Sequence, residues 1–182
     1  MNFEPLAIAE VILIRPRVFA DVRGYFLESW EERKFAAAGI EARFVQDNHS
    51  RSVRHVLRGL HYQLRHPQGK LVRVVAGTAL DVAVDLRRSS PTFGRWVGQI
   101  LSEENHHMLW VPPGFAHGYL ALSDRVDFLY RCTDFYAPND EHTVLWNDPD
   151  LAIEWQLPHG VEPSLSGKDA AGVRFRDAEC YA

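Results

Sequence analysis

The chain has 182 residues, of which 46% are hydrophobic and 24% charged, and its formal net charge is −4. This length and composition predict one globular domain over residues 1–182, with no run of the roughly 20 apolar residues that a membrane-spanning helix needs. The acidic balance argues against a nucleic-acid-binding protein, which would carry a basic face.

The N-terminal part predicts a β-rich segment followed by a helix. The run over 6–16 is rich in β-formers, and the N-terminal stretch 1–17 lacks the basic head and small-residue cleavage site of a signal peptide. The helix is expected over 29–39, where Ser29 and Glu32 form a capping-box pattern and Gly39 is placed to end the helix. Because an apolar edge strand at 6–14 would be exposed in a monomer, we expect a homodimer.

The centre of the chain predicts strands separated by turns. Extended segments are expected over 44–52 and 56–64, followed by two strands within 70–87 that are joined near Gly77-Thr78, which is a hairpin signature. The alternation in the second arm of this hairpin predicts two faces. One face carries Leu80, Val82, Val84 and Leu86, and the other carries Asp81, Ala83 and Asp85.

The C-terminal half continues this pattern of short strands. It predicts a strand over 95–102, two strands around a Pro-Pro-Gly turn within 108–123, and a strand over 127–136. The segment 163–172 predicts a short helix or turn. Short strands at intervals of about ten residues are typical of an antiparallel β-sandwich or β-barrel.

Nine histidines on a predicted barrel raise the question of a metal site. Metal-binding barrels of the cupin type usually present two histidines one residue apart on a strand, so that both rings face inward. Here Gln63 stands two residues after His61, and the adjacent His106 and His107 would point to opposite faces of a strand. Since no three ligands converge at workable spacing, we expect no metal ion.

Several polar residues interrupt the apolar strands. His61 alone would be a core histidine satisfied by a hydrogen bond. Lys70 follows only nine residues later, so the two residues could be neighbours in a strand pair, and Asp81 and Asp85 share one face of the following arm. Buried charge costs several kcal/mol unless it is paired, so a polar-lined barrel interior explains these residues better than an apolar core does.

Three further positions leave two interpretations open. Arg58 lies three residues from His61 and would face the other way, unless Gly59 hosts a β-bulge. Tyr130, which shares a strand face with Phe128 and Cys132, is either a barrel-filling aromatic or a residue with a chemical role. In the same way, His117 follows a tight turn and is either a strand-end histidine or a site residue.

Seven motifs occur in order along the chain: DVRGYFLE, VQDNHSRS, VLRGLHYQ, GKLVRVVAGTALDVAVDLRRSSPTFGRW, WVPPGFAHGYLAL, YRCTDFYAPNDEHTVLWNDPDLAIEW and PSLSGKDAA. Together they strongly resemble the dTDP-4-dehydrorhamnose 3,5-epimerase family, in a match that runs from residue 3 to residue 176. The resemblance implies a cupin-like antiparallel β-barrel, mainly β with a few short helices. It also implies a homodimer that uses no metal ion and no other cofactor. The two cysteines, Cys132 and Cys180, are too few for a disulfide framework and predict the cytoplasm.

The resemblance further implies a role for each matched position. His61 matches the general base of the family, and Asp169 matches the carboxylate paired with that base. Tyr130 matches the general acid, and Lys70 matches the lysine near the sugar carbonyl. From the sequence alone, Asp169 could instead be the last residue of a Ser-x-x-Asp helix cap that begins at Ser166. Substrate-contacting positions are matched by Arg23, Glu28, Gln46, Asp47, Asn48, Arg58, Lys70, His117, Glu141 and Lys168.

The implied reaction converts dTDP-4-dehydro-6-deoxy-D-glucose to dTDP-4-dehydro-L-rhamnose by epimerisation at C3 and C5. Removing a proton next to a ketone needs a base that titrates near neutrality, and inversion needs an acid on the opposite face of the sugar. Two alternatives stay open. One is an enzyme that inverts only C3 or only C5 of a related nucleotide-linked 4-keto-deoxysugar, and the other is a non-catalytic sugar-binding barrel.

Overall fold

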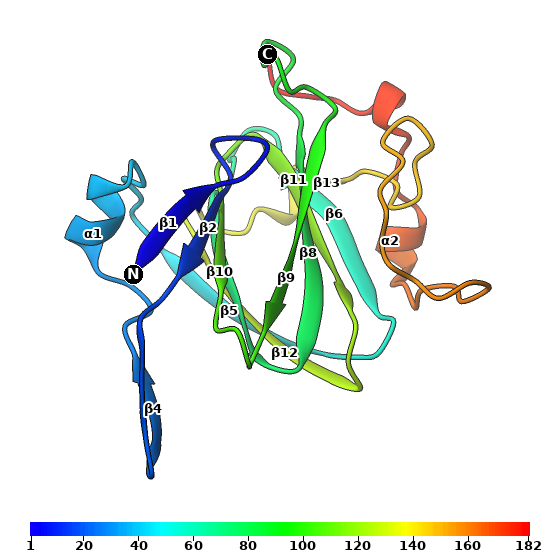
Figure 1. Cartoon of the computed structure of the whole chain (residues 1–182). Helices are drawn as coiled ribbons and strands as arrows, with labels where there is room; N and C mark the ends of the chain where they lie inside the picture. Colours follow the sequence, from blue (N-terminus) through cyan, green and yellow to red (C-terminus); the bar gives the residue numbers. More distant parts are fainter.

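Two β-sheets face each other as the walls of a barrel in the computed structural model, which describes residues Met1–Ala182 (Figure 1). All strand pairs are antiparallel, which confirms the expected mainly β, antiparallel barrel. The six-stranded sheet contains, in spatial order, β1 (Asn2–Pro5), β2 (Ile12–Arg15), β10 (Met108–Val111), β7 (Lys70–Ala76), β12 (Arg125–Cys132) and β5 (Gln46–Val53). The five-stranded sheet contains β13 (Glu141–Thr143), β6 (Leu57–Gln63), β11 (Phe115–Ala121), β8 (Thr78–Asp85) and β9 (Trp96–Ser102).

From β5 to β13, consecutive strands alternate between the two sheets, except for β8 and β9, which pair with each other. The predicted hairpin within 70–87 is wrong, because β7 belongs to the six-stranded sheet and β8 to the five-stranded sheet. Gly77 makes the switch with φ +78°, at a point where a Cβ atom would collide with the carbonyl oxygen of Arg125. The strands β10 and β11 change sheets in the same way. A glycine turn between two apolar runs is compatible with both arrangements, so periodicity could not distinguish them.

The run over 6–16 does not form an exposed edge. Only Ile12–Arg15 is a strand, and it lies between β1 and β10. Ile8, Val11 and Leu13 are fully buried within one chain. The prediction of an edge strand that a second copy would have to cover is therefore wrong, because β1 covers it.

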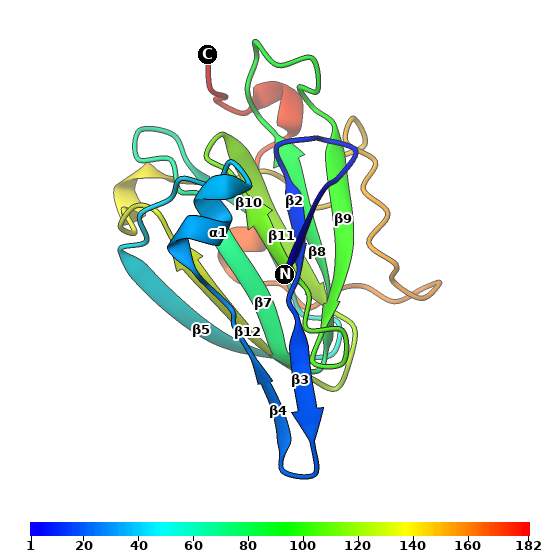
Figure 2. The ribbon, with the colours of Figure 1, turned by 60° about the vertical axis from the view of Figure 1, so that its left-hand side comes forward.

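The helix α1 (Glu32–Ala37) lies beside the six-stranded sheet (Figure 2). The predicted cap is wrong: the carboxylate of Glu31, not the hydroxyl of Ser29, accepts a hydrogen bond from the backbone N–H of Lys34 at 3.0 Å. A carboxylate at this position also stabilises the positive end of the helix dipole. Gly39 follows the helix with φ +82°, as predicted.

The remaining helices are single turns: η1 (Pro138–Asp140), α2 (Gly167–Ala170) and η2 (Phe175–Asp177). The helix α2 falls within the segment predicted as a short helix or turn. No helix in the structure is both long enough and apolar enough to cross a membrane.

The two faces of β8 belong to different cores, as the alternation predicted. Leu80, Val82 and Val84 pack on the outer side of the five-stranded sheet, where residues after β13 such as Trp155 cover them. Ala79 and Ala83 face the space between the sheets and join the main core of the barrel. Asp81 shares their face of the strand and is fully buried. The interior of the barrel therefore holds charge as well as apolar side chains.

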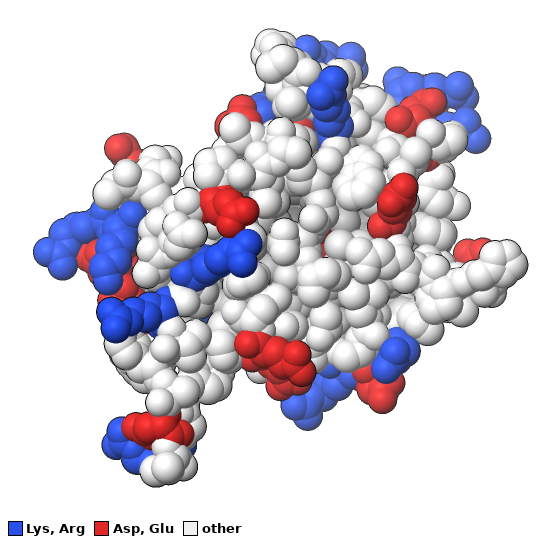
Figure 3. Space-filling model, in the orientation of Figure 1, with Lys and Arg blue, Asp and Glu red and all other residues white.

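A separate hairpin of β3 (Val18–Asp21) and β4 (Gly24–Leu27) projects from the barrel (Figures 1 and 2). Its exposed side chains are largely apolar and include Phe19, Tyr25 and Phe26. Charged groups of both signs lie at its tip (Figure 3), where Arg23 pairs with Asp21. An apolar arm of this kind is a candidate contact surface for another protein chain.

Candidate active site

A cavity of about 360 Å³ opens between the two sheets, and most of the side chains that line it are polar. It continues the barrel core, since Tyr119 and Phe128 belong to both. The structure brings together these predicted site residues at its walls: Gln46, Asn48, Arg58, His61, Lys70, His117, Tyr130, Glu141 and Lys168. The expected polar barrel interior is thus present. No three His, Cys, Asp or Glu side chains in the structure are grouped so that they could hold a metal ion.

His61 and Asp169 form a direct pair at one wall of the cavity. Nε2 of His61 lies 2.6 Å from Oδ1 of Asp169, and Nδ1 lies 4.0 Å from Oε1 of Glu141. Asp169 stands on α2, where Ser166 caps the helix and donates its hydroxyl to Oδ2 at 2.6 Å. Asp169 is therefore both part of the helix cap that begins at Ser166 and the partner of His61. The cap holds its carboxylate in the position where it contacts the histidine.

The environment of Asp169 keeps its carboxylate charged. Burial raises the pKa of Asp169, but the hydrogen bonds from His61 and Ser166, with a third from the backbone N–H of Gly59 at 3.2 Å, outweigh burial and lower this pKa to about 2. A carboxylate bonded to Nε2 favours the tautomer with the proton on that nitrogen. Nδ1 of His61 then carries the lone pair and can accept a proton.

Arg58 and His61 both face the cavity because β6 contains the predicted bulge. On β11, His117 pairs with His61 and Tyr119 pairs with Arg58, so three steps along β6 match two steps along β11. Gly59 lies inside the bulge with φ +117°, and a Cβ atom there would come 2.6 Å from Cα of Gly118. The glycine is what allows two polar side chains at an odd spacing to share one wall.

Gly59→Ala should lower the free energy of unfolding by about 2 kcal/mol or more, because the backbone is strained for alanine and the methyl group collides with the neighbouring strand. Urea unfolding followed by circular dichroism measures this change. Gly167→Ala is the matched control, since its Cβ would meet nothing within 4 Å, and we expect a change within about 0.5 kcal/mol. Equal unfolding midpoints for the two variants would contradict this account of the bulge.

Lys70 and Tyr130 approach the cavity from the other sheet. The expectation that the strands of His61 and Lys70 are neighbours is wrong, because β6 and β7 belong to opposite sheets. The loop between these strands crosses the barrel, so nine residues suffice to put the imidazole and the ammonium group on opposite walls. Burial lowers the pKa of Lys70. It raises the pKa of Tyr130 to about 12, so the hydroxyl keeps its proton at neutral pH.

Aromatic packing supports Tyr130 from behind. Its ring lies 6.2 Å from that of Phe128, which stacks on Tyr119 at 4.1 Å. The hydroxyl of Tyr119 in turn lies 3.0 Å from Oγ of Ser50 and 2.9 Å from Oγ of Ser52. Tyr130 is thus held by packing and also lines the cavity, so its two interpretations do not exclude each other.

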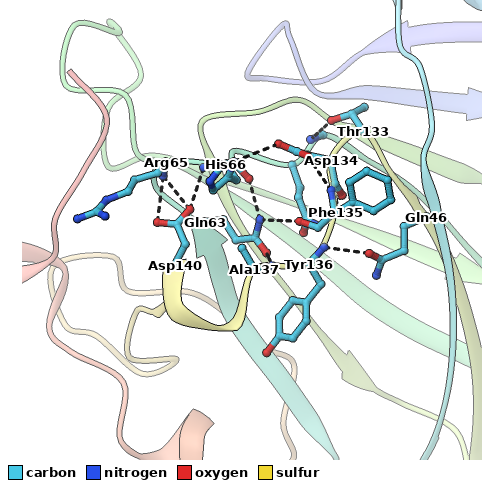
Figure 4. A network of polar contacts seen from close by, with 12 residues as sticks. Gln46, Gln63, Arg65, His66, Thr133, Asp134, Phe135, Tyr136, Ala137 and Asp140 are labelled. Carbon is cyan, nitrogen blue, oxygen red and sulfur yellow. Dashed lines mark hydrogen bonds and ion pairs between the residues drawn. The ribbon is translucent and has the colours of Figure 1, made fainter.

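A network of polar contacts at the mouth of the cavity fixes the loop over 133–140 (Figure 4). The side-chain amide of Gln63 donates to the carbonyl of Phe135 at 3.2 Å and accepts from the N–H of Ala137 at 2.8 Å. Gln46 accepts from the N–H of Tyr136 at 2.9 Å. These contacts hold one rim of the cavity in a defined position.

The same rim carries a carboxylate with two partners. Glu141 accepts hydrogen bonds from Nζ of Lys168 at 2.5 Å and from the hydroxyl of Tyr136 at 2.6 Å. Burial raises the pKa of Glu141, but these two bonds outweigh burial and lower it. Glu141 is therefore a charged group at the mouth, within reach of His61.

Four predicted residues do not line the cavity of their own chain: Asp169, which reaches it only through His61, and three that lie away from it. Arg23 lies at the tip of the projecting hairpin and is 86% exposed, and Glu28 pairs with Nζ of Lys34 at 2.5 Å. Asp47 lies on the outer face of the six-stranded sheet, with Oδ1 3.4 Å from Nε of Arg131. The structure of one chain brings none of the three to His61.

Several lining residues were missed by the sequence analysis. Alternation could have found Ser50, since Gln46, Asn48 and Ser50 share one face of β5, and Tyr119, which stands two residues after His117. Other lining residues come from loops or lie outside this alternation, and no periodicity predicts them. These are Gln68, Tyr136, Tyr62 and Gly118, whereas Gln63, two residues after His61 on β6, could have been found by alternation.

Comparisons with known proteins agree with this geometry. The chain matches a family model described as dTDP-4-dehydrorhamnose 3,5-epimerase over residues 5–177. It is 58% identical over 182 residues to the dTDP-4-dehydrorhamnose 3,5-epimerase of Pseudomonas aeruginosa, an alignment that covers 100% of this chain and 99% of the relative.

Two solved structures are also similar. The dTDP-6-deoxy-D-glucose-3,5-epimerase of Legionella pneumophila, in complex with dTDP-4-keto-L-rhamnose, has a TM-score of 0.94 and 49% identity, covering 98% of this chain and 94% of that chain. A 3′-monoepimerase from Streptomyces bikiniensis, in complex with dTDP-quinovose, has a TM-score of 0.88 and 35% identity, covering 94% of this chain and 87% of that chain.

Proposed function

The chain belongs to the dTDP-4-dehydrorhamnose 3,5-epimerase family, and we propose that it epimerises dTDP-4-dehydro-6-deoxy-D-glucose at C3 and C5 to give dTDP-4-dehydro-L-rhamnose. One observation carries this proposal. A histidine paired with a charged carboxylate and a protonated tyrosine line one cavity from opposite sheets. A protein that only binds a sugar needs neither a base nor an acid, so this pair favours an enzyme.

The base in this proposal is Nδ1 of His61. The 4-keto group acidifies the hydrogens on C3 and C5, and a neutral imidazole removes such a proton near neutral pH. Asp169 orients the ring and stabilises the imidazolium ion that forms. The 2.6 Å contact between the two side chains supports this division of roles.

The negative charge of the enolate needs a partner, and we assign Lys70 to it. Its ammonium group is buried in the cavity wall opposite His61, where a charge acts more strongly than it would in water. His117 lines the same cavity and is assigned to the binding of the sugar.

Tyr130 is assigned as the acid that completes the inversion. It enters the cavity from β12, in the sheet opposite His61, and at neutral pH it still holds the proton that it would donate. A proton removed on one face of the sugar and returned on the other inverts the carbon. Repeating the two steps at the second carbon gives the double epimer.

The rest of the dTDP-sugar would be bound by the polar residues around the mouth. Arg58 and Lys168 supply positive charge for the diphosphate, and Gln46, Asn48 and Glu141 supply hydrogen-bonding groups. We also propose that the enzyme works in the cytoplasm, which the two free cysteines support.

Proton NMR in D₂O tests the proposed reaction. The enzyme and dTDP-4-dehydro-6-deoxy-D-glucose should give a product with deuterium at both C3 and C5 and with the L configuration. Exchange at only one carbon would support the single-carbon alternative, as in the Streptomyces bikiniensis 3′-monoepimerase. Absence of exchange at both carbons would favour a binding protein and overturn the proposal.

We further propose that Arg23 and Glu28 act in the cavity of a second copy of the chain. The β3–β4 hairpin that leads to them projects from the barrel and exposes Phe19 and Phe26, apolar surface that a partner would cover. Light scattering should therefore give about twice the mass of one 20.8 kDa chain. A mass near 20.8 kDa at micromolar concentration would contradict a dimer.

Mixing two inactive variants tests whether each active site of the dimer uses residues of both chains or of one chain only. Arg23→Ala lacks the residue proposed to reach across, and His61→Asn lacks the base. Random mixing makes half of the dimers hybrid, each with one intact site of two, so about a quarter of the wild-type activity should return. No recovery after exchange of subunits would show that Arg23 does not serve the partner's cavity.

A further inference from the structure

One side of the cavity contains a chain of side-chain hydroxyl groups that ends on an arginine. Nε of Arg58 on β6 donates a hydrogen bond to Oγ of Ser52 on β5 at 3.0 Å. The same Oγ lies 2.9 Å from the hydroxyl of Tyr119 on β11, which in turn lies 3.0 Å from Oγ of Ser50. Because β5 is the edge strand of one sheet and β6 and β11 belong to the other, these contacts tie the two walls of the cavity together.

Ser52 is the member of this chain that is hidden behind the cavity wall. It is 3% exposed and does not line the cavity, whereas the other three members do. A hydroxyl group donates one hydrogen bond and accepts others, so Ser52 can accept from the guanidinium and donate to Tyr119. Tyr119 can then donate to Ser50. Every bond of the chain then runs outward from the guanidinium, an order in which each bond strengthens the next.

The contacts of Arg58 fix part of its guanidinium and leave the rest free. A guanidinium has five N–H groups. Nε donates to Ser52, and Nη2 donates to the backbone carbonyl of Arg51 at 3.2 Å. Five groups less these two leaves three for a ligand. Since Arg58 lines the cavity and guanidinium groups match the oxygens of phosphate, the free groups are suited to the diphosphate of the substrate.

Ser52 can hold Arg58 because Ser52 is itself held. The ring of Tyr119 is 4% exposed and stacks on Phe128 at 4.1 Å, which fixes the hydroxyl that contacts Ser52. The side chain of Arg58, in contrast, is exposed, so burial does not fix it. A side chain that is already in position loses less conformational entropy when a ligand binds.

We propose that Ser52 is a positioning residue for the substrate: its hydroxyl, held by Tyr119, keeps the guanidinium of Arg58 in position for the diphosphate of the dTDP-sugar. The inference rests on the proposed role of Arg58 at the diphosphate. Ser52 does not line the cavity, so it acts through Arg58. Its removal should weaken the binding of the diphosphate and leave the chemistry at the sugar ring unchanged.

Ser52→Ala removes the hydroxyl and tests this role by titration with dTDP and with thymidine. The binding of dTDP should weaken at least about fivefold, whereas the binding of thymidine, which has no phosphate, should change less than about twofold. With the dTDP-sugar, KM should rise at least about fivefold while kcat stays within about twofold of the wild-type value. Ser52→Thr keeps a hydroxyl and should restore the affinity for dTDP.

A double-mutant cycle with Arg58→Met separates a positioning role from a merely structural one. Methionine keeps an unbranched side chain and removes the guanidinium, which should weaken dTDP binding at least about tenfold. Adding Ser52→Ala to Arg58→Met should then have no further effect, because the hydroxyl has no guanidinium left to hold. Losses that simply add in the double variant would overturn the inference.

Ser102→Ala is the matched control. Ser102 is also a buried strand serine, 6% exposed, and its hydroxyl accepts a hydrogen bond from the N–H of Asn105 at 3.0 Å. It lies on β9 and does not line the cavity. Its replacement should lower the unfolding midpoint as Ser52→Ala does, yet leave the affinity for dTDP at the wild-type value.

If Ser52→Ala does not fold, Tyr119→Phe takes its place in the same cycle, since it removes the hydroxyl that holds Ser52 and keeps the ring on Phe128. Failure of the proposed function would look different: the sugar would not be epimerised, whereas dTDP binding and the cycle would still be as expected. Wild-type affinity for dTDP in a folded Ser52→Ala protein, or in Tyr119→Phe where that variant replaces it, would overturn the inference.

Discussion

His61→Asn should lower kcat by at least about 100-fold, the usual contribution of a general base. Asparagine has no group that accepts a proton near neutral pH, although its amide can still contact Asp169. His61 is partly exposed and lines the cavity. The loss should therefore appear in turnover and not in the unfolding midpoint or in the affinity for dTDP.

The control for this variant is His142→Asn. His142 is the neighbour of Glu141 on β13, but it stacks on Tyr62 at 5.2 Å and does not line the cavity. Its replacement should leave the rate near the wild-type value. A folded His61→Asn enzyme that keeps near-normal activity would remove His61 from the mechanism.

Tyr130→Phe should separate proton removal from inversion. The phenylalanine keeps the ring and its packing against Phe128, so the loss of stability should be about 1 kcal/mol, the value of one hydroxyl. His61 is untouched and can still form the enolate. Without the acid on the opposite wall, the enolate should be reprotonated from the side of His61, with no change of configuration.

The measurement is NMR in D₂O on the wild type and on Tyr130→Phe. In the mutant, deuterium should enter the starting sugar faster than the epimer appears, because the imidazolium can exchange its proton with solvent while the enolate is bound. In the wild type, exchange and inversion should occur together. A mutant that epimerises at the wild-type rate would show that Tyr130 only fills the barrel.

The polar interior and the bulge could be predicted from residue types and spacing. Charged residues on an otherwise apolar strand face are too costly for a core, which pointed to the cavity around His61. Gly59 between two residues at an odd spacing pointed to the bulge that brings Arg58 to the same wall. Both inferences depend on the type and spacing of residues that are close together in the chain, and these can be read from the sequence.

The pairing of the strands could not be predicted in this way. Alternation shows which residues share a face of β7 or β8, but it does not show which sheet each strand joins, because that depends on contacts far apart in the chain. For the same reason, His61 and Lys70 were expected on adjacent strands and instead lie on opposite walls. The cap of α1 was misplaced because Ser29 and Glu31 both stand near the helix start, and only the backbone decides between them.

The most direct test of the account is a crystal structure of the protein with a bound dTDP-sugar such as dTDP-4-keto-L-rhamnose. The sugar ring should lie between the two sheets, with Nδ1 of His61 on one face of C3 and C5 and the hydroxyl of Tyr130 on the other. Its C4 oxygen should lie within hydrogen-bonding distance of Nζ of Lys70. A sugar ring bound outside the cavity, or with both side chains on the same face, would contradict the proposed mechanism.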